Sequence, residues 1–366
     1  MALSYMSDRT RKIPYTEAVR EALDVCMARD DKVVVIGEGV PDPKAIFGTT
    51  RGLAEKYGPR RVFDMPVAEN GMTGICIGAA LTGMRPVLVH QRIDFSLLAM
   101  DQLVNNAAKW HYMFDGKANV PMVIRMIIGQ GWGQGPQHSQ SLQSMFAQVP
   151  GLKVVMPVTP HDAKGMLIAS VEDDNPVIFI EHRWLQQIED HVPRDHYRVP
   201  LNEARLLSEG DAVTVAAFSY TALETLSVAK ALATTMGIYT DVLDMRAVRP
   251  LDSEAVIRSV SKTGRLIVAD TAFYTGGIAG EVIAQVTERA FGMLKAAPVR
   301  IALPDFPIPT SHFMTKDWYP GPKTIAEAVI DLIGADRGTE DYASLCAALR
   351  PQVRHDTPNR DFVGPF

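Results

Sequence analysis

Two residues of this chain, Glu69 and His138, have local contexts that suit proton-transfer chemistry. Glu69 opens the apolar, Gly- and Ala-rich segment GMTGICIGAALTG. A carboxyl that is desolvated in such a segment can act as an acid or a base near neutral pH. His138 follows the Gly-rich loop GQGWGQGPQ, where an exposed imidazole can stabilise or shuttle charge. Each residue also has a simpler interpretation, as an acid favoured by a helix dipole or as an ordinary surface or core histidine.

Phe95, in the run QRIDFSLLAMDQ, lies at a predicted strand-to-helix junction. An aromatic side chain there can give a planar ligand ring an apolar face to stack on, although most phenylalanines are simply core residues. The loop from Gly129 to Gly135 has the spacing G-x-G-x-G-x-G, which is neither a dinucleotide-binding nor a P-loop fingerprint. The loop therefore does not predict a phosphate site.

Short apolar runs alternate with helical stretches over the first half of the chain. Helical spacing or composition marks four segments, residues 16–30, 71–83, 95–114 and 161–173. Thr16 is the expected cap of the first of these helices. Strands are predicted at residues 32–37, 86–90, 121–128, 151–157 and 176–182. Because these strands are almost entirely apolar and are separated by helices, they predict a parallel sheet that is covered on both faces.

Residues 185–204 are polar and irregular and contain prolines, which is typical of an inter-domain linker. A second α/β unit follows, with predicted strands at 212–219, 239–245, 265–270 and 298–303 and predicted helices at 221–234, 253–262 and 280–294. We therefore predict an α/β protein of two doubly wound domains, residues 1–190 and 191–335. Residues 336–366 form a C-terminal extension, in which only residues 342–353 have brief helical character.

The chain has 366 residues, of which 47% are apolar and 22% charged, the balance of a globular protein with a large core. Its net charge of −5 indicates no basic surface for nucleic acid. No run of about 20 apolar residues could span a bilayer, and the first residues resemble neither a secretion signal nor a transit peptide. The scattered Cys26, Cys76 and Cys346 fit buried thiols in a reducing compartment. We expect a cytoplasmic protein without nucleic-acid or membrane partners.

The contexts and the spacing of Glu69 and His138 resemble those of the beta subunit of the thiamine-dependent first component of 2-oxoacid dehydrogenase complexes. The likeness is to the pyruvate, acetoin and branched-chain types, and it covers about residues 12–335. It implies a pyrimidine-binding transketolase-like domain followed by a transketolase C-terminal domain. It also implies that Glu69 protonates the pyrimidine ring of thiamine diphosphate, that Phe95 stacks on this ring, and that His138 assists the acyl step.

The chemistry of this cofactor explains why an acid would be needed at Glu69. Thiamine diphosphate becomes a nucleophile when its thiazolium carbon loses a proton, and its own amino group removes that proton only in the imino form. A carboxyl group hydrogen-bonded to pyrimidine N1′ favours this imino form.

The same resemblance implies a structural monovalent cation such as K⁺, bound mainly through main-chain oxygens. The matching residues are Met122, Ser170, Val171, Asp173 and Asn175. Carbonyl ligands place little demand on residue type, and the run EDDNP is otherwise only a turn.

One motif of free-standing thiamine enzymes is missing from this chain. These enzymes hold Mg²⁺ and the diphosphate with a GDG motif and asparagines about thirty residues further on. Here Gly210-Asp211-Ala212 lacks the second glycine and the downstream asparagines, and Asn105-Asn106 has no GDG before it. We therefore expect the diphosphate and Mg²⁺ to be held by an alpha subunit in an α₂β₂ heterotetramer.

The resulting hypothesis is a beta subunit that helps to cleave a 2-oxo acid or acetoin and passes the acyl group to a lipoyl group, as in the acetyl-transferring type. A lipoyl acyltransferase core is then a further expected partner. The first alternative is a transketolase-like C–C ligase or lyase without a lipoyl partner, because the extension beyond residue 335 could block docking. The second alternative is a non-catalytic assembly subunit. Trp132 and Pro136 could narrow the pocket, and the sequence leaves the substrate open.

Overall fold

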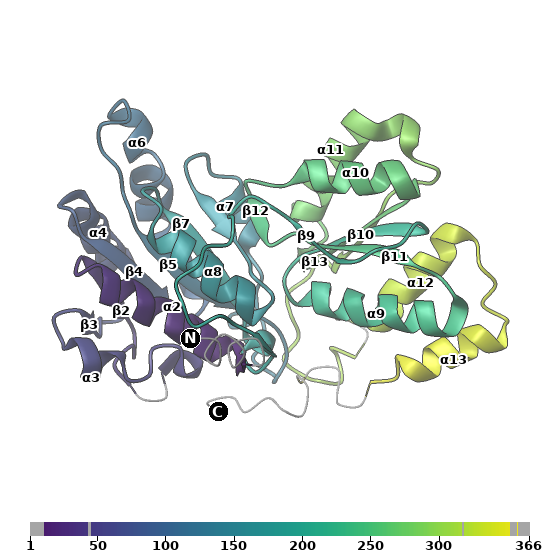
Figure 1. The fold of residues 1–366 in the computed structure, drawn as a ribbon, viewed down its shortest axis with the longest axis horizontal. Helices are drawn as coiled ribbons and strands as arrows, with labels where there is room; N and C mark the ends of the chain where they lie inside the picture. The colour runs from purple at the N-terminus through teal and green to yellow at the C-terminus, as the bar shows by residue number, and fades with distance from the viewer. Residues whose placement is uncertain (1–10, 43–44, 317, 352–356, 358–366) are drawn as a thin grey trace, which may run out of the picture. The chain divides into compact units, whose positions relative to one another are not determined.

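A computed structural model describes residues 11–42, 45–316, 318–351 and 357 of the chain (Figure 1). By their internal contacts the described residues form two compact units. The first comprises residues 11–128 and 145–201, and the second comprises residues 129–144 and those from 202 onwards. The loop that carries His138 therefore belongs to the second unit by its contacts. The predicted domain boundaries at residues 190 and 335 stay predictions.

The first unit is built on a parallel sheet. Its strands are β2 (Val33–Gly37), β3 (Val62–Phe63), β4 (Arg85–His90), β5 (Val123–Ile128), β6 (Lys153–Val155) and β7 (Val177–His182). They lie in the order β6-β7-β5-β4-β2-β3, and each neighbouring pair is parallel. Every residue of β2, β5 and β7 is buried, which explains their continuous apolar sequences. A separate antiparallel pair joins β1 (Lys12–Pro14) to β8 (Glu189–His191).

Helices cover this sheet. The longer ones are α2 (Tyr15–Arg29), α4 (Glu69–Leu81) and α8 (Pro160–Val171). The shorter ones are η1 (Ala45–Gly48), α3 (Leu53–Tyr57), α5 (Ile93–Ser96), η2 (Leu97–Ala99), η3 (Gln102–Ala107), α6 (Trp110–Met113), α7 (Gln143–Ala147) and η4 (Arg183–Leu185). Helices α2 and α8 pack against each other, and α4 packs on β4, η2 and η3. Their arrangement is visible in Figure 1.

The predicted cap of the first helix is wrong. Helix α2 begins at Tyr15, its N-cap is Pro14, and Thr16 lies buried in the first turn. The first backbone N–H groups are satisfied from outside the helix, because Tyr15 N donates to Ile188 O at 3.0 Å and Thr16 N to Gln186 O at 3.2 Å. A capping side chain is therefore not needed.

The segment predicted to be helical over residues 95–114 is helical, but it is not one regular helix. It divides into α5, η2, η3 and α6, and η3 winds as a π-helix. Asn105 donates to Asp101 at 2.7 Å on the exposed side of this segment. Wide turns of this kind often occur at functional sites.

The second unit contains a five-stranded sheet in the order β14-β13-β10-β11-β9. Its strands are β9 (Arg205–Ser208), β10 (Val213–Ala217), β11 (Thr240–Asp244), β13 (Leu266–Phe273) and β14 (Val299–Leu303). All neighbouring pairs are parallel except β11 with β9. The helices are α9 (Tyr220–Met236), α10 (Ser253–Thr263), α11 (Ile278–Ala290), η5 (Phe291–Met293), α12 (Pro322–Ile333) and α13 (Glu340–Ala348), and β12 (Ala247–Arg249) is a further short strand.

The two α/β units with helices packed on parallel strands confirm the predicted fold class. In the predicted extension, α13 packs on α9, its Leu345 is buried, and the Tyr342 hydroxyl donates to Glu327 of α12 at 3.0 Å. Cys26 and Cys76 are buried free thiols, and Cys346 is half-buried. Within the described ranges, no helix is long and apolar enough to cross a membrane.

Candidate active site

Glu69 is the first residue of α4 and is only 5% exposed. Its main-chain oxygen accepts a hydrogen bond from the Thr73 hydroxyl at 2.7 Å. Its carboxylate has no hydrogen-bond or ion-pair partner among the described residues. Because a buried carboxylate normally has protein donors, this one is available to a ligand.

A second acid, Glu38, lies close to Glu69 and was not singled out from the sequence. It directly follows β2, and its Oε1 is buried without a partner among the described residues. Burial raises the pKa of the Glu38 carboxyl above its usual range, and the charges of Glu69 and Asp64 raise it further. The sequence did contain a signal, because ligands of parallel sheets bind beyond the carboxyl ends of the strands.

The carboxyl end of the neighbouring strand carries another buried polar residue. His90 ends β4 and is 2% exposed, and neither of its ring nitrogens has a partner in the described part of the chain. Burial lowers the pKa of His90 to about 4, so its imidazole is neutral at physiological pH. Gly37 pairs with Val89 in the sheet, so Glu38 and His90 are the next residues along two neighbouring strands.

Phe95 lies in α5, which follows β4 at the same edge of the sheet, and its side chain is half-buried. The adjoining η2 packs on α4, the helix that begins with Glu69. The first unit therefore places the predicted acid and the predicted stacking aromatic on two contacting segments.

His138 is exposed in the loop 129–144, and its N–H donates to Gly135 O at 3.5 Å. The glycines of this loop have a conformational role. Gly135 has a φ of +68°, and a Cβ added there would lie 2.5 Å from the Thr310 hydroxyl oxygen. Trp132 also adopts a positive φ, of 55°. The alternating glycines therefore allow the chain to turn closely around Thr310.

The far end of this loop is anchored by Gln143. Its amide donates to Asp270 Oδ1 at 2.8 Å and to the Thr271 hydroxyl at 3.1 Å. Asp270 is fully buried within β13, and burial raises its pKa to about 6 against the opposing effect of its hydrogen bonds. No local motif marks Gln143 or Asp270, because 127 residues separate them in the chain.

The residues predicted to bind a monovalent cation lie together in the first unit. Met122 O accepts from Val177 N at 3.0 Å, and Ser170 O accepts from Asp173 N at 3.3 Å. Asn175 N donates to the Asp173 carboxylate at 2.9 Å.

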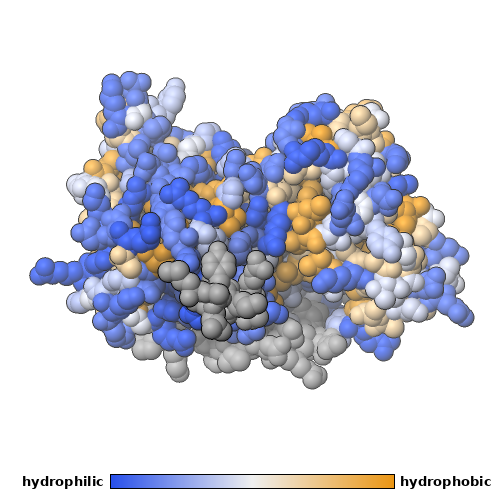
Figure 2. Space-filling model, in the orientation of Figure 1, coloured by the Kyte–Doolittle hydropathy of each residue, from blue (hydrophilic) through white to orange (hydrophobic). Residues whose placement is uncertain are grey.

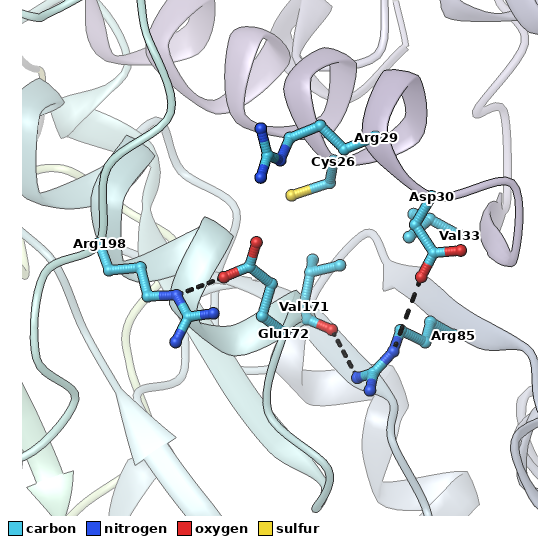
Figure 3. Close-up of a pocket in the computed structure, with 8 residues that line it drawn as sticks. All are labelled: Cys26, Arg29, Asp30, Val33, Arg85, Val171, Glu172 and Arg198. Carbon is cyan, nitrogen blue, oxygen red and sulfur yellow. Dashed lines mark hydrogen bonds and ion pairs between the residues drawn. The ribbon is translucent and has the colours of Figure 1, made fainter.

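Arg85 already supplies a positive charge at this turn. Its Nη1 donates to Val171 O at 3.1 Å and to Asp173 O at 3.0 Å, and its Nη2 pairs with Asp174 at 2.6 Å. Figure 3 shows Arg85 reaching the Val171 carbonyl. Two of the five residues predicted to bind a cation, Val171 and Asp173, thus already accept hydrogen bonds from Arg85 through their carbonyl groups, and the cation site stays a prediction. Elsewhere among the described residues, no cluster of three or more His, Cys, Asp or Glu side chains could hold a metal ion.

Each half of the chain matches a known protein domain family. Residues 11–187 match the pyrimidine binding domain of transketolase, and residues 202–325 match the transketolase C-terminal domain. The chain is 38% identical over 339 residues to the beta subunit of acetoin:2,6-dichlorophenolindophenol oxidoreductase from Bacillus subtilis. It covers 98% of that relative, and the match spans 88% of this chain. It belongs to the beta subunits of the 2-oxoacid and acetoin dehydrogenases.

Other members of this beta-subunit family are similarly related. The pyruvate dehydrogenase E1 component subunit beta of Rickettsia bellii is 37% identical, with 87% of this chain and 98% of that relative covered. The 2-oxoisovalerate dehydrogenase subunit beta of Pseudomonas aeruginosa is 38% identical, with 85% and 92% covered. A solved split-gene transketolase, an inactive beta4 tetramer, is 21% identical and shares the fold with a TM-score of 0.70 over 89% of this chain and 99% of that one.

The matches to these three relatives span 85–88% of this chain and 92–98% of the relatives. The matched C-terminal domain ends at residue 325, before α13 begins at Glu340. Helix α13 is thus an ordered addition to the matched domains.

Proposed function

We propose that this beta subunit helps to cleave the bond next to the carbonyl of a 2-oxo acid or of acetoin, using thiamine diphosphate. The observation that carries this proposal is the Glu69 carboxylate, buried at the start of α4 without a partner among the described residues. Glu69 lies in the part of the chain that matches a pyrimidine binding domain. A single buried acceptor of this kind fits a ring nitrogen that must be held and protonated.

The residues present fit the pyrimidine half of the cofactor. When bound, thiamine diphosphate supplies the carbon nucleophile of the reaction. Glu69 would hold the pyrimidine ring through N1′ and share a proton with it, and Phe95 would offer its half-buried face to the ring.

Glu38 restricts the charge at this site. Two carboxylates in one buried region disfavour double ionisation, and the pKa of Glu38 is raised in part by the charge of Glu69. Burial and these neighbouring charges together make Glu38 easier to protonate than an exposed glutamate.

His138 is proposed to assist the acyl step. It is exposed on a loop that glycine geometry and the Gln143–Asp270 hydrogen bond hold in place. An imidazole on such a loop can stabilise charge on the substrate oxygen or carry a proton.

The diphosphate half of the cofactor site is proposed to come from an alpha subunit. The names of the relatives as beta subunits support such a partner. The sequence contains no GDG motif to hold Mg²⁺, which prefers a near-octahedral set of oxygen ligands. We propose an α₂β₂ assembly, located in the cytoplasm, in which the alpha chain holds Mg²⁺.

This proposal has two forms, which differ in the molecule that accepts the acyl group. The main form passes an acyl group to a lipoyl group, with a lipoyl acyltransferase core as a further partner. One observation supports an uncoupled C–C ligase or lyase instead. Helix α13 lies beyond the matched domains and packs on α9, and such an addition could prevent docking of an acyltransferase.

The test is to assay the chain together with its alpha subunit, thiamine diphosphate and Mg²⁺ on pyruvate, branched 2-oxo acids and acetoin. Free lipoamide and 2,6-dichlorophenolindophenol serve as alternative acceptors. Substrate-dependent reduction of either acceptor supports thiamine-dependent cleavage, and acyl-lipoamide formation assigns the coupled form. Cleavage of none of these substrates would contradict the proposal. A chain truncated after Arg337 tests whether α13 limits transfer to a lipoyl domain.

A further inference from the structure

A polar pocket of about 580 Å³ lies in the first unit, apart from Glu69 and Glu38. It is lined by Cys26, Arg29, Asp30, Val33, Arg85, Val171, Glu172 and Arg198 (Figure 3). Val33 and Arg85 begin β2 and β4, so the pocket lies at the amino ends of these strands. Glu38 follows the carboxyl end of β2 and so lies at the opposite end of that strand. The volume is within the range of small-molecule sites.

The acids that line this pocket already have donors. Glu172 Oε1 contacts His196 Nε2 at 2.7 Å, and its Oε2 accepts from Arg198 Nε. Asp30 Oδ1 accepts from Lys32 N at 2.9 Å, and its Oδ2 lies 3.9 Å from Arg85 Nε. These carboxylates therefore offer few free acceptors to a ligand.

The arginines retain unused donors. Arg29 makes no hydrogen bond or ion pair with any described residue, so all five of its N–H groups are available. Arg198 uses only Nε, which leaves both of its terminal amino groups. In Figure 3, Arg29 extends from the last turn of α2 over the open space towards Glu172, and Arg198 lies on the far side of Glu172. Burial raises the pKa of the Cys26 thiol to about 12, so Cys26 adds no negative charge.

The geometry points to a binding site for a small oxyanion, a phosphate or carboxylate group held by Arg29 and Arg198. The planar guanidinium matches such groups with two parallel hydrogen bonds. A ligand bound there joins the end of α2 to the segment that contains Arg198. It should therefore stabilise the first unit against unfolding.

The experiment titrates inorganic phosphate, and separately malonate, into the full-length chain at constant ionic strength. Binding is followed by isothermal titration calorimetry and by the midpoint of thermal unfolding. Saturable binding of phosphate assigns a phosphate site, and saturable binding of malonate alone assigns a carboxylate site. Absence of saturable binding of both anions would overturn the proposal.

Two variants of the pocket should act in opposite directions. Arg29→Gln removes the free donor and should weaken binding by about tenfold or more, because hydrogen bonds to charged groups are among the strongest. Glu172→Gln removes the negative charge beside the anion and should tighten binding several-fold. General structural damage would weaken binding in both variants.

Arg60→Gln is the matched control, because Arg60 is also an exposed arginine without a partner in the described chain and lies outside the pocket. Phosphate also stabilises proteins by exclusion from their surface, and this effect should be equal in all variants. The proposal is contradicted if Arg29→Gln binds phosphate and malonate as the unmodified chain does, or if Arg60→Gln weakens binding equally.

Discussion

The first unit leaves the buried carboxylate of Glu69 without a partner among the described residues, whereas the second unit surrounds the buried carboxylate of Asp241 with donors. Asp241 Oδ1 accepts from Lys262 Nζ at 2.7 Å and from Gly210 N at 2.8 Å, and its Oδ2 accepts from the Ser259 hydroxyl at 2.6 Å. Both acids belong to α/β units with parallel strands. Burial alone therefore does not mark a functional acid; the difference lies in which donors the protein supplies.

Asp270 stands between these two cases. Its Oδ1 accepts from Gln143 and from Ala272 N, but its Oδ2 is buried without a partner among the described residues. Among the described residues, the Asp270 carboxylate therefore has hydrogen-bond donors at only one of its two oxygens. Substitution should therefore have a different consequence for each acid. We expect loss of activity at Glu69, loss of stability at Asp241 and gain of stability at Asp270.

Glu69→Gln should have the largest effect. An amide cannot share a proton with the pyrimidine nitrogen, so turnover of the complex with the alpha subunit should fall on the order of 10²–10⁴-fold. The fold should persist, because the Glu69 carboxylate has no hydrogen bond or ion pair with the described residues that the substitution would break. Steady-state kinetics at saturating thiamine diphosphate and circular dichroism measure the two quantities. Glu55→Gln, at an exposed acid of α3, is the control. A Glu69→Gln enzyme that keeps more than about half of its turnover would sink the assignment.

His138→Ala should slow the acyl step by on the order of 10²-fold, the lower end of the effects of acid–base groups. Affinity for thiamine diphosphate should change little, because His138 is assigned to the substrate. Single-turnover kinetics and cofactor titration separate these effects, with the exposed His111→Ala as control. The role is misassigned if cofactor affinity collapses while turnover at saturating cofactor is normal.

Asp241→Asn should reduce the free energy of unfolding by about 2–3 kcal/mol, because an amide nitrogen would meet the donors of Lys262, Gly210 or Ser259. Turnover per folded molecule should stay normal, in contrast to Glu69→Gln. Urea unfolding of the isolated chain measures the change. Unchanged stability together with lost turnover would show that Asp241 serves activity and not stability, contrary to this prediction.

Asp270→Asn should raise stability at pH 7 by roughly 1–2 kcal/mol. The pKa of Asp270 is raised from 3.8 to about 6 in the folded chain, so the carboxyl destabilises the fold when it is ionised. Its effect is absent below about pH 4 and grows as the pH rises to 6. Urea unfolding at pH 4 and pH 7 should therefore show a gap between variant and unmodified chain only at pH 7. An equal gap at both values would show that ionisation is not the cause.

Local sequence patterns predicted the parts of the fold that depend on local physics. Apolar runs such as VVVIG became fully buried strands, and Glu69 begins α4 where the apolar segment predicted a helix. The Thr16 cap was wrong because distant carbonyls at residues 186 and 188 satisfy the first N–H groups of α2. The segment 95–114 was predicted as helical, but periodicity could not reveal its π-helical turn.

The candidate site was predicted where a motif is local and missed where it is assembled from distant segments. Glu69, Phe95 and His138 each lie in a distinctive short run. Glu38 acts electrostatically on the site of Glu69 although the two residues lie far apart in the chain, and the contact between Gln143 and Asp270 likewise joins distant residues. The contacts of Arg85 with the predicted cation ligands also need the folded sheet.

On the proposed function, this chain supplies only the pyrimidine half of a cofactor site. This claim is tested most directly by titrating thiamine diphosphate and Mg²⁺ into the isolated chain and then into its complex with the alpha subunit. Stacking on Phe95 and a hydrogen bond to Glu69 contribute only a few kcal/mol before the entropy of association is subtracted. The isolated chain should therefore bind weakly or not at all and turn over no 2-oxo acid, and the alpha subunit should create two sites per α₂β₂ assembly. Micromolar binding together with turnover by the isolated chain would contradict the account.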